Sequence, residues 1–319
     1  MQWCRPNTAG CQPPPLQKHT ASLVGRKIFF IGGSYTRQDP IKGTMVEEYN
    51  NTIVFDTETM YWSTPACSGE IPPPRRAHTA TSVEDKIFVF GGSNGTTYYN
   101  DLYILDTKTF EWKKAQTSGQ QPGPRRAHSA SLIGTRIFIF GGGDGAFALN
   151  EIFTLDTEKL HWTLLSTKGA VPDPSGYHSA AVVDEKIVIF GGSDTQCCFS
   201  DMVVLDTTSN TWSKKKIASS KCRFAHSANA IGPWMFILGG SDGSTFLSDL
   251  NFLNLSTLEW MNTLIGGAAP SPRGYHTSIF CDSRLFVFGG SDENAIFNEL
   301  YILELGVNAY LALQTAKLN

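Results

Sequence analysis

The stretch PPPRRAHTATSVEDKIFVFGGSNGTTYYNDLYILDTKTFEW, residues 72–112, contains each feature that recurs along this 319-residue chain. In it, His78 lies 13 residues before the pair Gly91-Gly92, and Trp112 lies 21 residues after Gly91. The same histidine-to-glycine interval occurs six times. The histidines are His19, His78, His128, His178, His226 and His276, and the glycine pairs begin at Gly32, Gly91, Gly141, Gly191, Gly239 and Gly289. The 21-residue interval recurs at Trp162, Trp212 and Trp260.

One copy of the repeat predicts four strands, at residues 78–83, 86–92, 101–107 and 110–115. The second strand is continuously apolar, which is typical of a strand that is covered on both faces. The glycine pair ends this strand, because glycine permits a sharp change of direction and a close approach by a neighbouring backbone. Trp112 on the outermost strand is large enough to fill the space between adjacent sheets.

These glycine pairs, histidines and tryptophans, at a period near 50 residues, resemble the kelch repeat, in which one copy forms one blade of a β-propeller. The resemblance implies an all-β, six-bladed kelch propeller with four antiparallel strands per blade, formed as a single domain by residues 1–305. The period and the proline-rich linkers are closest in style to the leucine-zipper-like regulator and cell-polarity kelch proteins. The repeats are expected at residues 19–66, 78–116, 128–166, 178–216, 226–264 and 276–305.

The first residues of the chain match the end of a repeat. Trp3 precedes His19 by 16 residues, just as Trp62 precedes His78. Residues 1–5 are therefore predicted to form the outer strand of the last blade, which closes the ring and removes its exposed edges. Tyr310, 21 residues after Gly289, is the alternative closing residue, so residues 306–319 are either a C-terminal tail or the closing strand.

Composition excludes several classes of protein. The net charge of −3 provides no field that would attract nucleic acid, and no apolar run approaches the 18 residues needed to cross a membrane. The seven cysteines contain no C-x-x-C motif, and no secretory signal begins the chain. We expect neither nucleic-acid binding nor membrane insertion, and a location in the cytoplasm or the nucleus.

The repeated histidines are predicted to be structural, because a residue that satisfies the hydrogen bonds of each blade recurs in every blade, whereas a catalytic residue does not. We find no nucleophile–base pair, metal-ligand cluster or cofactor motif in the sequence. The expected protein is therefore not an enzyme, with no catalytic residue, no metal and no cofactor.

The linkers before the repeat histidines suggest a binding surface. Arginines stand three residues before four of these histidines, at positions predicted to line one mouth of the central channel; they are Arg75, Arg125, Arg223 and Arg273. Such a ring could bind an acidic or phosphorylated segment of a partner protein, since arginine pairs these groups bidentately. Alternatively, the arginines could neutralise polar residues of the neighbouring loops, which are Asn94, Asp144, Asp194, Asp242 and Asp292.

The first repeat departs from the others, because 30 residues rather than 21 separate Gly32 from Trp62. The surplus lies within residues 34–50, and exposed tyrosine and arginine are typical of interface centres. A partner is therefore predicted to dock off-centre, towards the first two repeats. The residues concerned are Tyr35, Arg37, Tyr49, Tyr98 and Tyr99.

The kelch resemblance implies a non-catalytic scaffold or adaptor for protein–protein interaction. One version of this role is the substrate receptor of a ubiquitin ligase. A different class is a small-ligand-binding propeller or an enzyme similar to a sugar-acid mutarotase. A deep mouth lined by unpaired arginines would favour the small-ligand class, and a broad tyrosine-rich rim would favour the scaffold.

Overall fold

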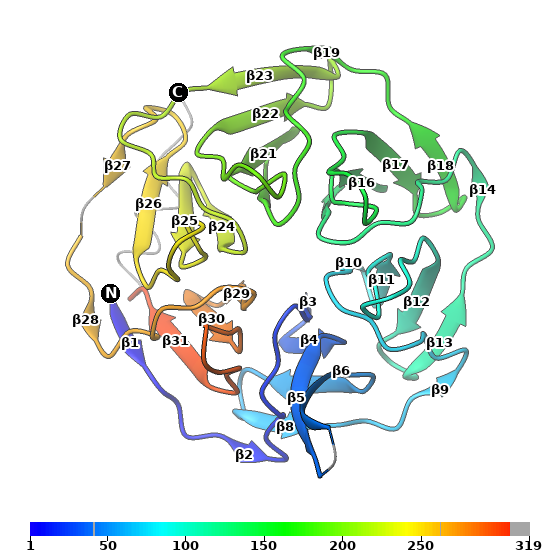
Figure 1. Cartoon of the computed structure of the whole chain (residues 1–319), viewed down its shortest axis with the longest axis vertical. Coiled ribbons are helices and arrows are strands. Elements are labelled where there is room, and N and C mark those ends of the chain that lie inside the picture. Colours follow the sequence, from blue (N-terminus) through cyan, green and yellow to red (C-terminus); the bar gives the residue numbers. More distant parts are fainter. Residues whose placement is uncertain (41, 262, 307–319) are drawn as a thin grey trace.

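Six small sheets stand around one axis in the computed structural model, which describes residues 1–40, 42–261 and 263–306 (Figure 1). In every sheet, neighbouring long strands are antiparallel, and the second strand is buried between the blades on either side. The predicted all-β, six-bladed propeller is therefore confirmed. No helix able to span a membrane occurs in the described part of the chain.

The strands of each blade follow the repeat, and their order below runs from the axis outward. Blade 1 contains β3 (Thr20–Val24), β4 (Lys27–Ile31), β7 (Thr52–Asp56), β8 (Tyr61–Ser63) and β2 (Ala9–Gly10). Blade 2 contains β10 (Thr79–Val83), β11 (Lys86–Phe90), β12 (Leu102–Asp106), β13 (Glu111–Lys114) and β9 (Ser68–Gly69). Blade 3 contains β15 (Ser129–Ile133), β16 (Arg136–Phe140), β17 (Ile152–Asp156), β18 (His161–Leu164) and β14 (Ser118–Gly119).

The second half of the ring repeats this arrangement with one exception, in blade 5. Blade 4 contains β20 (Ser179–Val183), β21 (Lys186–Phe190), β22 (Met202–Asp206), β23 (Thr211–Lys215) and β19 (Lys168–Gly169). In its described residues, blade 5 contains β24 (Ser227–Ile231), β25 (Trp234–Leu238), β26 (Leu250–Asn254) and β27 (Trp260–Met261), without a fifth strand. Blade 6 contains β29 (Thr277–Cys281), β30 (Arg284–Phe288), β31 (Leu300–Glu304), β1 (Gln2–Cys4) and β28 (Gly266–Gly267).

The N-terminal strand closes the ring. Strand β1 pairs antiparallel with β31, with Trp3 opposite Leu303, and Trp3 is buried in the last blade. The closing role predicted for Trp3 is thus confirmed. Its alternative, Tyr310, lies outside the described residues.

A short fifth strand, which the repeat did not predict, lies parallel to the outer strand of five blades. Each comes from the linker entering that blade and ends in a glycine with positive φ, such as Gly69 opposite Trp112. A Cβ on Gly69 would lie 2.2 Å from the Trp112 carbonyl oxygen, so only glycine fits there. The linker into blade 5 has Ser219 at the equivalent position, and no fifth strand occurs among the described residues of that blade.

Aromatic side chains fill the spaces between blades. The ring centroid of Trp162 in blade 3 lies 5.0 Å from that of Phe90 in blade 2, and the Trp212 centroid lies 5.2 Å from that of Phe140. The equivalent distance from Trp260 to Phe190 is 6.3 Å. At this position, packing between blades 4 and 5 is therefore looser than between blades 2 and 3 or between blades 3 and 4.

The loops that join the second and third strands share one face of the ring with the linkers that enter the first strands. We call this the loop face. In blade 1 this loop is a two-stranded hairpin of β5 (Ser34–Asp39) and β6 (Gly43–Glu48), which accounts for the extra length of the first repeat (Figure 1).

Candidate functional site

The four repeat arginines lie inside the blades. Arg75 is 1% exposed, and its Nη1 donates to the Gly91 carbonyl oxygen at 2.9 Å and to Asp101 Oδ1 at 2.8 Å. Arg125, Arg223 and Arg273 make the same two kinds of contact, with carboxylates of Glu151, Asp249 and Glu299. Each arginine thus holds its linker to the start of a third strand, and the prediction that these four side chains line the channel mouth is wrong.

Among the described residues, the polar loop residues form no ion pair with those arginines. The Asp144 carboxylate accepts hydrogen bonds from the backbone N–H groups of Ala146 and Phe147, both at 2.8 Å. These backbone donors lower the pKa of Asp144. The same turn recurs in four other loops, at Asn94, Asp194, Asp242 and Asp292. These side chains therefore shape the loops by accepting hydrogen bonds from backbone N–H groups of the same loop.

The six histidines join adjacent blades, in agreement with their predicted structural role. Each imidazole Nε2 is hydrogen bonded to a hydroxyl group on the first strand of the preceding blade, as in His78 with Thr20 at 3.0 Å and His128 with Thr79 at 2.9 Å. Complete burial lowers the pKa of all six, to about 3 for His78 and about 4 for His178. They are neutral at physiological pH.

A closed ring of backbone hydrogen bonds surrounds the axis at the channel mouth. The residue before each histidine has positive φ, and its N–H donates to the carbonyl oxygen of the equivalent residue in the preceding blade at 2.7–3.0 Å. The six residues are Lys18, Ala77, Ala127, Tyr177, Ala225 and Tyr275. Because these backbones are fixed by the ring, their side chains are presented at defined positions around the axis.

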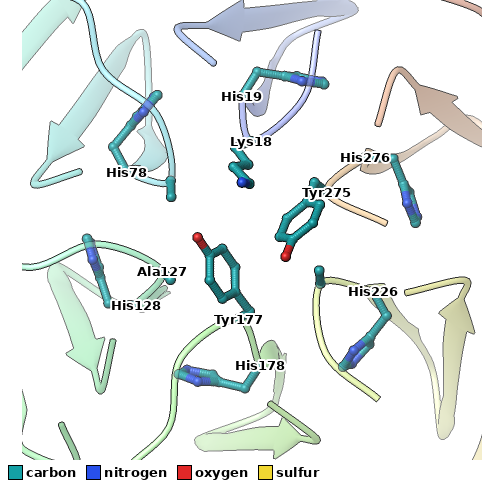
Figure 2. A pocket seen from close by; sticks show the side chains of 12 residues that line it. Lys18, His19, His78, Ala127, His128, Tyr177, His178, His226, Tyr275 and His276 are labelled. Carbon is teal, nitrogen blue, oxygen red and sulfur yellow. The ribbon is translucent and has the colours of Figure 1, made fainter. Parts of the chain in front are cut away.

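Three of these side chains are large and converge on the axis, as Figure 2 shows for Lys18, Tyr177 and Tyr275. They line a cavity of about 140 Å³ at the channel mouth. The Lys18 ammonium nitrogen lies 4.4 Å from the ring centroid of Tyr275, which in turn packs edge-on against Tyr177. Aromatic faces stabilise a cation at this distance by about 0.5–2 kcal/mol.

Positive charge accumulates around this cavity. Burial, with the neighbouring guanidinium groups of Arg76 and Arg126, lowers the pKa of Lys18 to about 8. Arg76 pairs with Glu48 of the hairpin at 3.3 Å. In residues 1–40, 42–261 and 263–306, no carboxylate lies within ion-pair distance of Lys18 or Arg126. Partly desolvated cations without a carboxylate are costly to the fold, and such arrangements cluster at binding sites.

A second hollow of about 110 Å³ adjoins the mouth and shares Ala127 and Tyr177 with it. Tyr98 and Arg126 form one wall, with the Arg126 guanidinium 5.1 Å from the ring centroid of Tyr98. Phe147 forms another wall and is 76% exposed. We call this hollow the loop groove; it runs over the loops of blades 2 to 4. An exposed phenylalanine beside a cation is typical of a surface that binds another molecule.

The other predicted binding residues divide between the hairpin and blade 2. Tyr35 donates a hydrogen bond to Glu47 at 2.9 Å and packs edge-on against Tyr49, while Arg37 is exposed near the hairpin tip. Tyr99 stacks on the buried Arg75. Only Tyr98 lines the loop groove, so the structure does not bring the predicted residues together at one point.

Sequence reasoning did not identify Lys18, Arg76, Arg126, Tyr177 or Phe147 as site residues. A signal was present in the column directly before the repeat histidines, where Lys18, Tyr177 and Tyr275 interrupt three alanines. The second arginine of each Arg-Arg pair was a further signal. In the residues described by the structure, no three histidine, cysteine, aspartate or glutamate side chains gather to hold a metal ion.

Comparison with known proteins is consistent with this architecture. The model of the KLHDC2/KLHL20/DRC7 Kelch-repeats domain matches residues 41–240 and 218–317. The chain belongs to this kelch-repeat family.

Curated relatives match over shorter stretches. Rab9 effector protein with kelch motifs from Xenopus laevis is 33% identical over 97 residues, which are 30% of this chain and 25% of that protein. Kelch domain-containing protein 2 from Mus musculus is 33% identical over 108 residues, or 29% of this chain and 26% of that protein. Rho GTPase-activating protein gacHH from Dictyostelium discoideum is 38% identical over 91 residues, or 28% and 5%. These matches cover at most about a quarter of each relative.

Proposed function

We propose that this propeller is a non-catalytic scaffold that binds a protein partner on its loop face, over the channel mouth. Two partly buried cations without a carboxylate partner among the described residues carry this proposal: Lys18 at the mouth, and Arg126 in the loop groove, which the exposed Phe147 also lines. Kelch relatives include a protein named as an effector of Rab9, which agrees with a role in protein interaction.

The partner segment that fits this surface combines an acidic group with an apolar side chain. A carboxylate or a phosphate at the mouth would neutralise Lys18 and Arg126, and both tyrosine hydroxyls of Tyr177 and Tyr275 could donate hydrogen bonds to it. An apolar side chain next to the acidic group would cover Phe147 in the loop groove. The hairpin, through Tyr35 and Arg37, offers a second contact area for a larger partner.

The size of the mouth favours a protein partner over a small substrate. Pockets for small ligands usually enclose about 300–1,000 Å³. The mouth cavity of about 140 Å³ and the adjoining loop groove of about 110 Å³ suit single side chains. A mutarotase-like enzyme or small-ligand protein is therefore the weaker proposal for this face.

A random peptide library selected on the wild-type domain tests the proposal. We expect enriched peptides to contain Asp or Glu next to a large apolar residue. Arg126→Glu should weaken the best synthetic peptide by about tenfold or more, because a like charge then faces its acidic residue. Arg136→Glu, an equal charge reversal at the opposite ends of the strands, should leave the affinity unchanged.

Two further binding measurements identify the group that the mouth recognises. Replacing the acidic residue of the peptide by phosphoserine or by alanine and measuring the affinity shows whether the mouth binds a carboxylate, a phosphate or no anion. Deleting residues 37–45, the tip of the hairpin, should leave the domain folded and weaken a larger partner more than a short peptide. Selected peptides without acidic residues, or equal binding to Arg126→Glu and the wild type, would contradict the proposal.

A further inference from the structure

A larger cleft lies between blades 4 and 5. Its volume is about 400 Å³. It extends from the turn that joins β20 to β21 and the turn that joins β26 to β27 as far as Met202 and Lys215, at the loop-face ends of β22 and β23. The proposed function on the loop face does not involve this cleft.

The cleft forms because a smaller side chain occupies one position of the repeat at this interface. Val188 on β21 forms part of its wall. The equivalent residue is phenylalanine in each of the other five blades, namely Phe29, Phe88, Phe138, Phe236 and Phe286. Trp260 also fills its position less completely than the other blade tryptophans: it remains partly exposed, and its Nε1 donates to the Ala218 carbonyl oxygen at 3.1 Å.

The walls of the cleft are mostly apolar. They consist of Val183, Val188, Met202, Val204, Leu255 and Leu258. Val188 and Met202 are buried at the bottom, whereas the other four are partly exposed. A cleft of this size with apolar walls and a few polar groups is within the range of small-molecule sites.

Charge is distributed unevenly along the cleft. At one end, Lys186 stands opposite Asp206 in the strand register, and its positive charge contributes to the lowered pKa of the Asp206 carboxyl. At the other end, Lys215 stands opposite Met202. Within the described part of the chain, no carboxylate lies within ion-pair distance of Lys215. The equivalent residues in blades 1 to 3 are Pro65, Ala115 and Leu165, so this lysine is peculiar to blade 4.

We propose that this cleft is a binding site for a small amphipathic carboxylate, with its apolar body against Val188, Val204 and Leu258 and its carboxylate at Lys215. Burial of the apolar body supplies most of the affinity. The lysine selects an anionic head over a neutral or cationic one.

Calorimetric titration with octanoate, 1-octanol and octylammonium tests this site. Octanoate should bind with one-to-one saturation, 1-octanol several-fold more weakly, and octylammonium most weakly. Val188→Phe, which restores the side chain of the other blades, should lower the octanoate affinity by about tenfold or more, because it fills the site. Val204→Phe narrows the same cleft, and this variant is used for the test if Val188→Phe fails to fold.

Two matched substitutions on strand β23 test the role of the Lys215 charge. Lys215→Ala should remove the preference for octanoate over 1-octanol. Lys214→Ala, which removes the adjacent charge that pairs with Asp201 at 2.8 Å, should keep that preference. Absence of saturable octanoate binding to the wild type, or undiminished binding to folded Val188→Phe, would overturn the proposal. Arg126→Glu on the loop face should not change octanoate binding, which separates this site from the peptide site.

Discussion

The interface between blades 2 and 3 and the interface between blades 4 and 5 use equivalent positions of the repeat but differ in how these are filled. Trp162 is 1% exposed and packs on Phe90, whereas Trp260 is partly exposed and lies farther from Phe190. Phe88 in the first interface corresponds to Val188 in the second. The second interface contains the cleft.

Close to the axis, the two interfaces are alike. His128 is hydrogen bonded to Thr79 at 2.9 Å, and His226 to Ser179 at 2.8 Å. The backbone ring at the mouth also passes through both without a break. The polar links near the axis are therefore kept at both interfaces, whereas the apolar packing at the rim differs and leaves room for a site between blades 4 and 5.

Acid should break both interfaces alike, and this is the largest effect we expect. Burial disfavours the charged form and lowers the pKa of His128 and His226, which link these two interfaces, well below the ordinary 6.5. The pKa falls to about 3 for His19, His78 and His276, which link other blades. Below pH 6.5 the unfolded chain therefore binds more protons than the folded one, and stability is lost as the pH falls towards about 3. Each such histidine contributes up to about 1.4 kcal/mol per pH unit.

Urea unfolding followed by circular dichroism from pH 8 to pH 4.5 measures this loss. The free energy of unfolding should be nearly constant above about pH 7 and fall steeply below about pH 6. Replacing the exposed His161 by Gln should leave the slope unchanged. A flat profile between pH 7 and pH 5 would show that the buried histidines do not link the blades as neutral groups.

Truncating the tryptophans should separate the two interfaces. Trp162→Ala removes a fully buried ring and should lower the free energy of unfolding by about 3–5 kcal/mol. Trp260→Ala removes a partly exposed ring and should lower it by about 1–2 kcal/mol. Urea unfolding at pH 7.5 measures both, and equal losses would contradict the difference in packing.

The sequence predicted the parts of this molecule that repeat. The positions of His78, Gly91 and Trp112 recur because every blade needs a hydrogen bond to its neighbour, a sharp end to its second strand and a large side chain between the sheets. The register of Trp3 with Trp62 indicated the closing strand. Side-chain direction could not be derived in the same way. Arg75 stands in a linker at the mouth, and only the fold shows that Asp101, 26 residues later, lies where it pairs with that guanidinium.

The site residues were harder to predict for a different reason. Lys18, Arg126 and Phe147 occupy positions that vary among the repeats, and their meaning depends on which loops meet in space. The cleft is a similar case: the valine at position 188 is visible in the sequence, but the loose Trp260 that accompanies it is not.

The smallest expected effect concerns the linker into blade 5. Ser219 has a φ of 57°, which is unfavourable for a residue with a side chain, and it replaces the glycine found in the equivalent linkers. Ser219→Gly should relieve this strain, and the more flexible unfolded chain should offset part of the gain, leaving a net stabilisation of at most about 1 kcal/mol. The change would also permit a fifth strand beside Trp260, so the backbone amide of Trp260 should exchange more slowly with deuterium.

The reverse substitution, Gly169→Ser, places a Cβ 2.2 Å from the Trp212 carbonyl oxygen and should destabilise blade 4 by about 1–3 kcal/mol. If Gly169→Ser is tolerated while Ser219→Gly changes neither stability nor exchange, the linker glycine does not determine the fifth strand, and the loose rim of blade 5 has its origin in the packing around Val188 alone.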